Sequence, residues 1–196
     1  MARYVVLGNS GSGKSTLAAR LAHAGGLAHL DLDTLAWRPT MPPERRPVAD
    51  SARDIAAFVA ASERWVIEGC YADLVDVALA GTEPSPKPLA SRPEGLELRS
   101  EGPAEQDLRR SADRLLWLDP GVEACLANAR ARPWEPHKYP SQAAQDANLA
   151  MLLDWIRAYE TRDDVCSRAA HRALFDRFRG DKLALTTREA IAAFAP

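Results

Sequence analysis

Near the start of the chain, glycines, a lysine and a serine follow the spacing GxxxxGKS. The eight residues are Gly8, Asn9, Ser10, Gly11, Ser12, Gly13, Lys14 and Ser15. Glycines at the first and sixth positions let the backbone turn tightly and approach a phosphate that a Cβ would obstruct. Consecutive N–H groups at the start of a helix then form an anion site. The motif follows an apolar run and precedes a helical pattern, a context that argues against a chance glycine-rich turn.

In a phosphate loop (P-loop) of this kind, the last side chains contact the phosphates and the metal ion. We expect Lys14 to reach the β- and γ-phosphates of ATP and the Ser15 hydroxyl to ligate Mg²⁺. Thr16, the next residue, completes the expected nucleotide contacts. The motif therefore predicts a triphosphate site with ATP and Mg²⁺ as cofactors.

Acidic residues stand where two apolar runs end. Asp31 and Asp33 alternate across Leu32, so on a strand their side chains point to the same face. Because ligands of open α/β sheets bind at the carboxyl ends of strands, we expect Asp31 to hold Mg²⁺ through water. Asp33 is expected to accept a hydrogen bond or a proton from an acceptor hydroxyl, and Glu68 to organise the water shell of the metal. The alternative is that these carboxylates only cap and solvate strand ends.

Residues 130–141 combine prolines with positive charge and aromatic rings, and the prolines forbid a helix there. We interpret this segment as a lid. Arg132 is expected to neutralise the transferred phosphoryl group and Arg130 to bind the nucleotide, with His137 and Lys138 adding charge. A solvated basic loop is the alternative.

Further side chains allow two interpretations each. Arg45, Arg46 and Arg53 either bind an acceptor or form a solvated face. Several aromatic rings either orient a substrate or pack in the core: Trp37, Trp134, Trp155, His171 and Phe175. The cysteines, Cys70, Cys125 and Cys166, lack the CxxC spacing of a zinc or thiol redox site, so we expect them to be reduced and structural.

Hydrophobic patterning predicts the elements that position these residues. Short apolar runs indicate strands at 4–7, 27–32, 65–67, 115–118 and 182–185, the third ending at Glu68 beside the P-loop strand. Helical periodicity indicates helices at 16–22, 52–61, 72–79, 120–130, 142–159, 165–178 and 188–194. Gly25 and Gly26 are expected to stop the first helix, and Asp119 to cap the fourth. Alternating strands and helices predict an α/β fold in which helices cover both faces of a parallel sheet.

Composition limits the remaining possibilities. The chain has 196 residues, 46% of them hydrophobic and 27% charged, so we expect a single domain over 1–196. Proline and glycine dominate residues 81–107, which predicts a flexible surface insertion. A net charge of −2 argues against nucleic acid as a partner. We find no apolar segment long enough for a signal peptide or a membrane span, and therefore expect a cytoplasmic protein.

Taken together, these residues resemble the P-loop small-molecule kinases of the adenylate kinase and shikimate kinase group. Residues 32–37 and 65–71 are similar to the bacterial topology-modulation, or adenylate-kinase-like, proteins. The resemblance implies a P-loop NTPase fold with a five-stranded parallel sheet, a lid, and transfer of the γ-phosphoryl group of ATP. Neither group's substrate carries over, because the turn after the third strand is Glu68, Gly69, Cys70 and Tyr71 and matches neither.

We therefore expect an ATP-dependent phosphotransferase that acts on a hydroxyl or phosphate group of a small molecule. The alternative is a nucleotide-binding regulatory ATPase or a nucleic-acid-associated protein without kinase activity. The sequence leaves open the identity of the acceptor, the oligomeric state, and whether Asp33 acts as a base or only positions the substrate.

Overall fold

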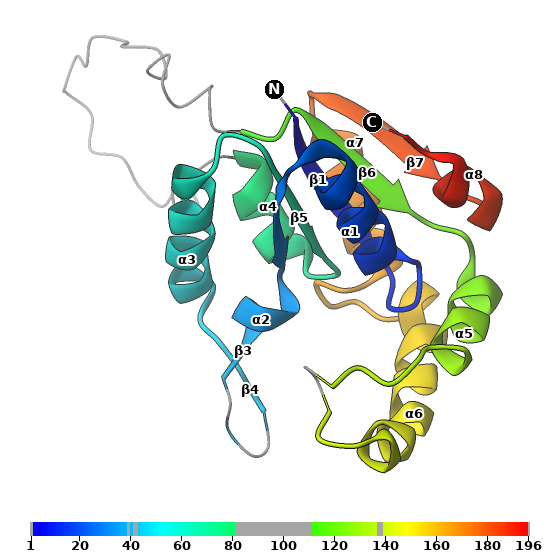
Figure 1. Ribbon diagram of the computed structural model, residues 1–196. Helices are drawn as coiled ribbons and strands as arrows, with labels where there is room; N and C mark the ends of the chain where they lie inside the picture. Colours follow the sequence, from blue (N-terminus) through cyan, green and yellow to red (C-terminus); the bar gives the residue numbers. More distant parts are fainter. Residues whose placement is uncertain (1, 39, 41–42, 81–110, 137–138, 196) are drawn as a thin grey trace, which may run out of the picture.

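The computed structural model describes residues 2–38, 40, 43–80, 111–136 and 139–195. Its centre is a parallel five-stranded sheet in the order β2-β5-β1-β6-β7, which confirms the predicted α/β fold (Figure 1). The strands are β1 (Arg3–Gly8), β2 (Ala28–Asp31), β5 (Trp65–Gly69), β6 (Arg114–Leu118) and β7 (Asp181–Leu185). The P-loop strand β1 lies at the middle of the sheet, between β5 and β6.

Side chains of β1 alternate between two separate cores because successive residues of a strand point to opposite faces. Val5 and Leu7 pack with α3 (Val48–Ala61), α4 (Ala72–Ala80) and α7 (Arg168–Arg177) on one face. Tyr4 and Val6 pack with α1 (Lys14–Gly25) and α8 (Arg188–Ala193) on the other. Every residue of β1 is buried, as expected for the central strand of a parallel sheet covered on both faces.

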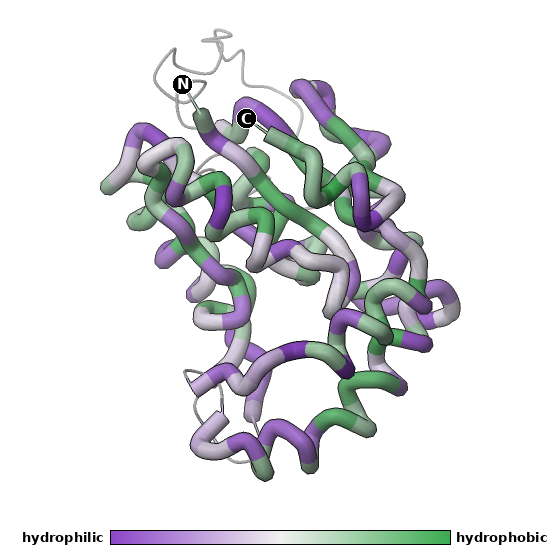
Figure 2. Tube along the Cα trace, turned by 45° about the vertical axis from the view of Figure 1, so that its right-hand side comes forward, coloured by the Kyte–Doolittle hydropathy of each residue, from purple (hydrophilic) through white to green (hydrophobic). Residues whose placement is uncertain are grey.

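Two projections extend beyond the carboxyl edge of the sheet, where α1 begins (Figure 1). One consists of the short helix α2 (Asp33–Ala36) and a hairpin of β3 (Trp37–Arg38) and β4 (Glu44–Arg45). The other consists of α5 (Val122–Arg130) and α6 (Gln142–Arg157), and the 3-10 turn η1 (Ala158–Glu160) then leads back to α7. A second direction of view keeps both projections on the same side of the sheet (Figure 2).

Several sequence predictions are corrected by the structure. Asp33 does not lie on the second strand, because β2 ends at Asp31 and α2 begins at Asp33. Asp119 does not cap α5: Gly121 occupies the cap position, and Asp119 instead accepts hydrogen bonds from Arg168. The helix expected at 165–178 begins only at Arg168, because the Ser167 hydroxyl caps it.

Gly26 ends α1 in the left-handed conformation, as predicted. The proposed insertion at 81–107 lies outside the described residues, as do His137 and Lys138 of the lid segment. Within the part of the chain that the structure describes, no helix is long and apolar enough to cross a bilayer.

Candidate functional site

The 8–15 loop joins the end of β1 to the start of α1, and its glycines adopt backbone angles that other residues rarely reach. Gly11 has a φ of 75° and Gly13 a φ of 94°, both in the left-handed region. A Cβ on Gly11 would also collide with the carbonyl oxygen of Cys125. The glycine-rich sequence is therefore required by the shape of the loop, and Gly13 places the first free N–H groups of α1 at its inner side.

Two asparagine side chains hold the loop in place. Asn9 donates from Nδ2 to the carbonyl oxygen of Ile156 at 3.2 Å and accepts from the Ser10 N–H at 2.8 Å. Asn128, on α5, donates to the carbonyl oxygen of Gly11 at 2.8 Å. The side chain of Asn9 thus supports the loop, and its carbonyl oxygen accepts a hydrogen bond from Nζ of Lys14 at 2.9 Å. Asn128 is a supporting residue that the sequence did not reveal.

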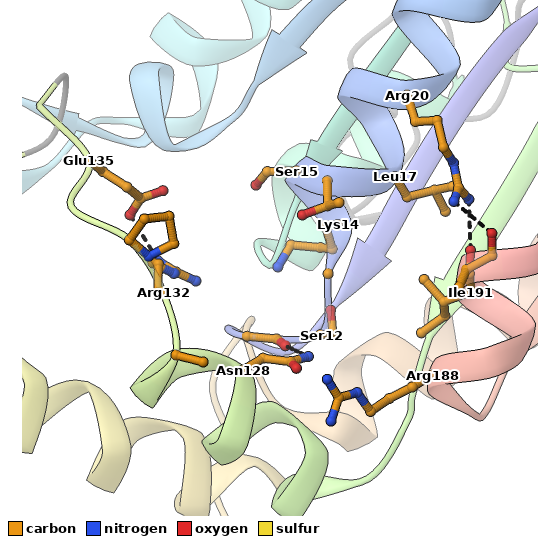
Figure 3. A pocket seen from close by; sticks show the side chains of 16 residues that line it. Ser12, Lys14, Ser15, Leu17, Arg20, Asn128, Arg132, Glu135, Arg188 and Ile191 are labelled. Atoms are coloured by element: carbon orange, nitrogen blue, oxygen red, sulfur yellow. Dashed lines mark hydrogen bonds and ion pairs between the residues drawn. The ribbon is translucent and has the colours of Figure 1, made fainter.

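A cavity of about 560 Å³ opens in front of the loop (Figure 3). Lys14 and Ser15 form one wall, and Arg132 and Glu135 stand on the opposite wall. Arg188 extends from the first turn of α8 toward the loop. The volume falls in the range of small-molecule sites, about 300 to 1,000 Å³. Arg188 was overlooked in the sequence because an arginine that begins a terminal helix looks like an ordinary surface residue.

Two polar atoms at the loop are buried without a hydrogen-bond partner among the described residues: the Ser12 hydroxyl oxygen and Oε1 of Glu68. Buried polar groups are nearly always hydrogen-bonded, so such atoms indicate a site that a ligand completes. A triphosphate oxygen suits the Ser12 hydroxyl, and a metal-bound water suits a carboxylate oxygen. The loop and its surroundings therefore fit Mg²⁺ and a nucleotide.

Burial controls the charge of Glu68. The side chain is 2% exposed, and burial raises its pKa to about 7, while Lys14 and a hydrogen bond from Ser15 act in the opposite direction. Nε2 of His29 lies 3.9 Å from Oε1 of Glu68, but burial lowers the pKa of His29, so its ring is mostly neutral at pH 7. Glu68 is therefore a carboxyl group that readily exchanges a proton near neutral pH.

Asp31 and Asp33 lie close to Glu68, since the charges of both raise its pKa. Asp31 pairs with Glu68 in the register of β2 and β5, and its Oδ1 accepts a hydrogen bond from the Asp33 N–H at 2.9 Å. No group of three or more His, Cys, Asp or Glu side chains within the described ranges is arranged to hold a metal. A Mg²⁺ ion here would depend on Ser15, water and phosphate oxygens, with Asp31 and Glu68 contacting its waters.

Residues 132–135 of the proposed lid segment are held in place on the far side of the cavity. Arg132 pairs with Glu135 at 3.1 Å, and the Gln145 side chain bonds both the Glu135 N–H and the Pro133 carbonyl. Arg130 is the last residue of α5 and lines a separate cavity of about 80 Å³. Arg132 lines both cavities, so of these two arginines it is the one that shares a cavity with Lys14 and Ser15.

Arg162 is a buried arginine that the sequence did not single out. Its side chain is 9% exposed and stacks over Trp155, and Nε lies 3.2 Å from Oδ2 of Asp164 without hydrogen-bond geometry. Nε and Nη1 have no hydrogen-bond partner among the residues that the structure describes. Arg162 and Lys14 both lower the pKa of the buried His171 ring, so the two charges lie near the same point. In the sequence, the neighbouring Asp163 and Asp164 make Arg162 look like part of a solvated turn.

The remaining candidates divide between support and exposure. His171 is fully buried and bonds the Tyr159 hydroxyl and the Cys70 carbonyl, while Phe175 packs against the core. The exposed rings are Trp37, Trp134 and Trp155, at 40%, 43% and 37% exposure. All three cysteines are buried free thiols, and Sγ of Cys166 donates a hydrogen bond to Sγ of Cys70 at 3.6 Å.

Each arginine considered for acceptor binding is paired with a carboxylate. Arg45 binds Asp73, Arg46 binds Asp54 and Arg53 binds Asp50. Each of these arginines therefore has an acidic neighbour, as Arg132 has in Glu135.

The chain matches no protein-family model and no curated protein. Among solved structures it is similar to an unliganded sugar kinase from Janibacter sp. HTCC2649, with a TM-score of 0.45 and 17% identity over 98% of this chain and 91% of that one. A gluconokinase from Sinorhizobium meliloti 1021 gives a TM-score of 0.44 and 16% identity over 97% and 85%. A shikimate kinase from Acinetobacter baumannii in complex with shikimate gives 0.33 and 15% over 89% and 92%.

At these scores and identities the likenesses carry no functional inference, and the resemblance to topology-modulation proteins stays a prediction. The class that the fold itself defines is an α/β protein with a parallel five-stranded sheet and a glycine-rich loop after its first strand.

Proposed function

We propose that the protein is a Mg²⁺-ATP-dependent phosphotransferase that acts on a small molecule. The observation that carries the proposal is the position of Arg132 across the cavity from Lys14 and Ser15, at a loop whose glycines are in the left-handed conformation. A P-loop alone serves many nucleotide-binding proteins. A second cation on the opposite wall is suited to the charge that develops on a phosphoryl group in transfer.

Each residue of the cavity has a role in this proposal. The N–H groups of the loop and the start of α1 bind phosphate oxygens, and Lys14 contributes a full positive charge among them. The Ser15 hydroxyl ligates Mg²⁺, which offsets charge on the phosphates, while Asp31 and Glu68 accept hydrogen bonds from its waters. Toward α8 the cavity is lined by Ile191, Ala192 and Arg188, which supply an apolar surface and a cation for the nucleoside end.

Arg132 and Asp33 complete the reaction centre. Arg132 neutralises the transferred group. Asp33 begins α2 beside Glu68 and contacts the acceptor. Closure of the lid segment over the cavity would exclude water, which favours transfer to another nucleophile over hydrolysis.

The experiment that tests the proposal measures ADP formation from Mg²⁺-ATP with a panel of sugars, nucleosides and metabolites. Stimulation by an acceptor, lost in Lys14→Ala, supports a kinase. Arg157→Ala, which removes a surface cation of α6 paired with Asp154, is the matched control and should keep normal turnover. Tight nucleotide binding with slow turnover that no acceptor stimulates would instead favour a nucleotide-dependent regulator. Near-normal transfer by a folded Lys14→Ala variant would contradict the mechanism.

A further inference from the structure

A chain of two hydrogen bonds ends at Asp33. Nε1 of Trp37 donates to the Tyr71 hydroxyl at 2.8 Å, and that hydroxyl donates to Oδ1 of Asp33 at 2.9 Å. The direction of the chain is fixed because an indole N–H can only donate. The Tyr71 proton must therefore point to Asp33, and Oδ1 of Asp33 must accept it. This arrangement fixes the orientation of the Asp33 carboxyl group.

Arg45 packs against the rings of Trp37 and Tyr71, and its positive charge is paired with Asp73. Its Cζ lies 4.5 Å from the centre of the Tyr71 ring and 5.9 Å from that of Trp37. Its guanidinium group is bound to both carboxylate oxygens of Asp73, at 3.0 and 3.1 Å. Tyr71 is only 6% exposed, so it is locked between Arg45 and Trp37, whereas Asp33 is exposed at the start of α2.

The arginines of the segment that follows Asp33 also have acidic neighbours. Each described arginine of the segment 37–54 lies within ion-pair distance of a carboxylate, including Arg38 and Glu44 at 3.9 Å. A phosphate monoester is usually bound by guanidinium groups whose donors are available to it. At Arg45 these donors are engaged by Asp73 and by the Ala36 carbonyl, and the carboxyl groups of Asp31 and Asp33 are unfavourable neighbours for a dianion.

We propose that the acceptor is an uncharged or cationic alcohol whose hydroxyl donates to Asp33, and that Tyr71 and Trp37 are positioning residues for this carboxylate. This inference rests on the proposed kinase function and narrows its acceptor from hydroxyl or phosphate to hydroxyl. In the reaction, a bond forms between the acceptor oxygen and the γ-phosphorus, and the bond from that phosphorus to the β,γ-bridging oxygen breaks. The bridging oxygen keeps the electron pair and leaves with ADP, and the hydroxyl proton passes to the Asp33 carboxylate.

The acceptor class is tested with pairs of compounds that differ only by a phosphate group, such as nucleosides against their 5′-monophosphates and hexoses against hexose 6-phosphates. ADP formation from Mg²⁺-ATP is measured with each compound. We expect the unphosphorylated member of a pair to stimulate turnover at least about tenfold more, which is the effect of about 1.4 kcal/mol of discrimination. A phosphate ester that is the better acceptor would overturn the inference but keep the kinase. Stimulation by neither set would overturn the kinase, and the inference with it.

The positioning role is tested with the stimulating alcohol and the variants Tyr71→Phe and Trp37→Phe. Loss of a hydrogen bond to a charged group should lower kcat/KM for the alcohol by about 10- to 100-fold. The KM for ATP and the Tm should stay close to the wild-type values. Tyr4→Phe, which removes a tyrosine hydroxyl from β1, is the matched control and should leave all three unchanged. A lower Tm together with a higher KM for ATP in Tyr71→Phe would show that Tyr71 is only a structural residue and would contradict the proposal.

Discussion

Asp31 and Glu68 lie opposite each other in the parallel pairing of β2 with β5, so two carboxylates meet at one point on the carboxyl edge of the sheet. The Asp31 charge raises the pKa of Glu68, in the same direction as burial. The pair can therefore hold a proton in the nucleotide-free protein and yield it when a cation arrives. Both the stability of the protein and its binding of metal should depend on pH for this reason.

Glu68 should make the nucleotide-free protein less stable as the pH rises. Its pKa is about 7 in the folded protein and 4.5 as an ordinary carboxyl, so the folded state holds the proton more tightly. Its contribution is then fully present below pH 4.5 and is lost as the pH rises through 7. The ceiling of this loss is about 3 kcal/mol, since a pKa unit corresponds to about 1.4 kcal/mol.

Urea unfolding of the wild type and of Glu68→Gln across this pH range measures the difference. The wild-type free energy of unfolding should fall relative to that of the variant. Glu44→Gln, at an exposed site on β4, should follow the wild type. Parallel curves for the wild type and Glu68→Gln would show that the buried carboxyl does not titrate in this way.

Binding of Mg²⁺ and nucleotide should release a proton from Glu68. A carboxyl with a pKa near 7 is mostly protonated at pH 6, whereas a carboxylate that accepts hydrogen bonds from metal-bound water must be ionised. Calorimetric titration with Mg²⁺-ADP at pH 6, in two buffers of different ionisation heat, counts the protons. We expect close to one proton released by the wild type and markedly fewer by Glu68→Gln; equal counts would exclude Glu68 from the metal shell.

The two lid arginines should differ sharply in their effect on turnover. Arg132 lines both the cavity opposite Lys14 and the smaller cavity beside it, whereas Arg130 lines only the smaller one. We expect Arg132→Ala to lower kcat by about 10²- to 10³-fold, as removal of a group that stabilises transition-state charge does. Arg130→Ala should change kcat by less than about threefold, which corresponds to less than about 1 kcal/mol. Comparable losses of kcat in both variants would contradict the different roles assigned to Arg132 and Arg130.

Replacement of Gly11 should damage the loop more than replacement of a glycine with a similar φ elsewhere. Gly11 and Gly26 have φ angles of 75° and 60°, but only a Cβ on Gly11 would meet other atoms, at Cys125. Gly26→Ala should cost about 1 to 2 kcal/mol, the usual penalty of this conformation. Gly11→Ala should cost more and also weaken Mg²⁺-ADP binding at least about tenfold, or about 1.4 kcal/mol. Thermal unfolding and calorimetry separate the two effects, and equal Tm losses with unchanged binding would contradict this account.

The parts of the molecule that could be predicted from the sequence are those set by local rules. The spacing GxxxxGKS reports a backbone shape directly, and the structure has the left-handed glycines that this shape requires. The five strands were found because each is a short apolar run, and Glu68 was correctly placed on the strand beside β1. Burial on both faces of a parallel sheet leaves a strong signal in composition.

The details that failed depend on contacts between distant residues. Asp33 was placed on a strand because Asp31, Leu32 and Asp33 alternate. The strand in fact ends at Asp31, and Asp33 is the first residue of α2. Tyr71 lies 38 residues from Asp33 in the sequence, and no local pattern shows that its hydroxyl donates to that carboxylate. Arg162 was missed because its sequence neighbours are polar, whereas its burial depends on its stacking over Trp155.

The hydrogen bond from Asn9 to Ile156 connects the phosphate loop to one end of α6. It joins the phosphate loop to the last turn of a helix of 16 residues, and the lid segment is attached at the other end of that helix. A helix of this length spans about 24 Å, so a tilt of about 5° at the loop would move the far end by about 2 Å. A small adjustment of the loop around phosphate would therefore produce a larger displacement at the first turn of α6, where the proposed lid segment is attached.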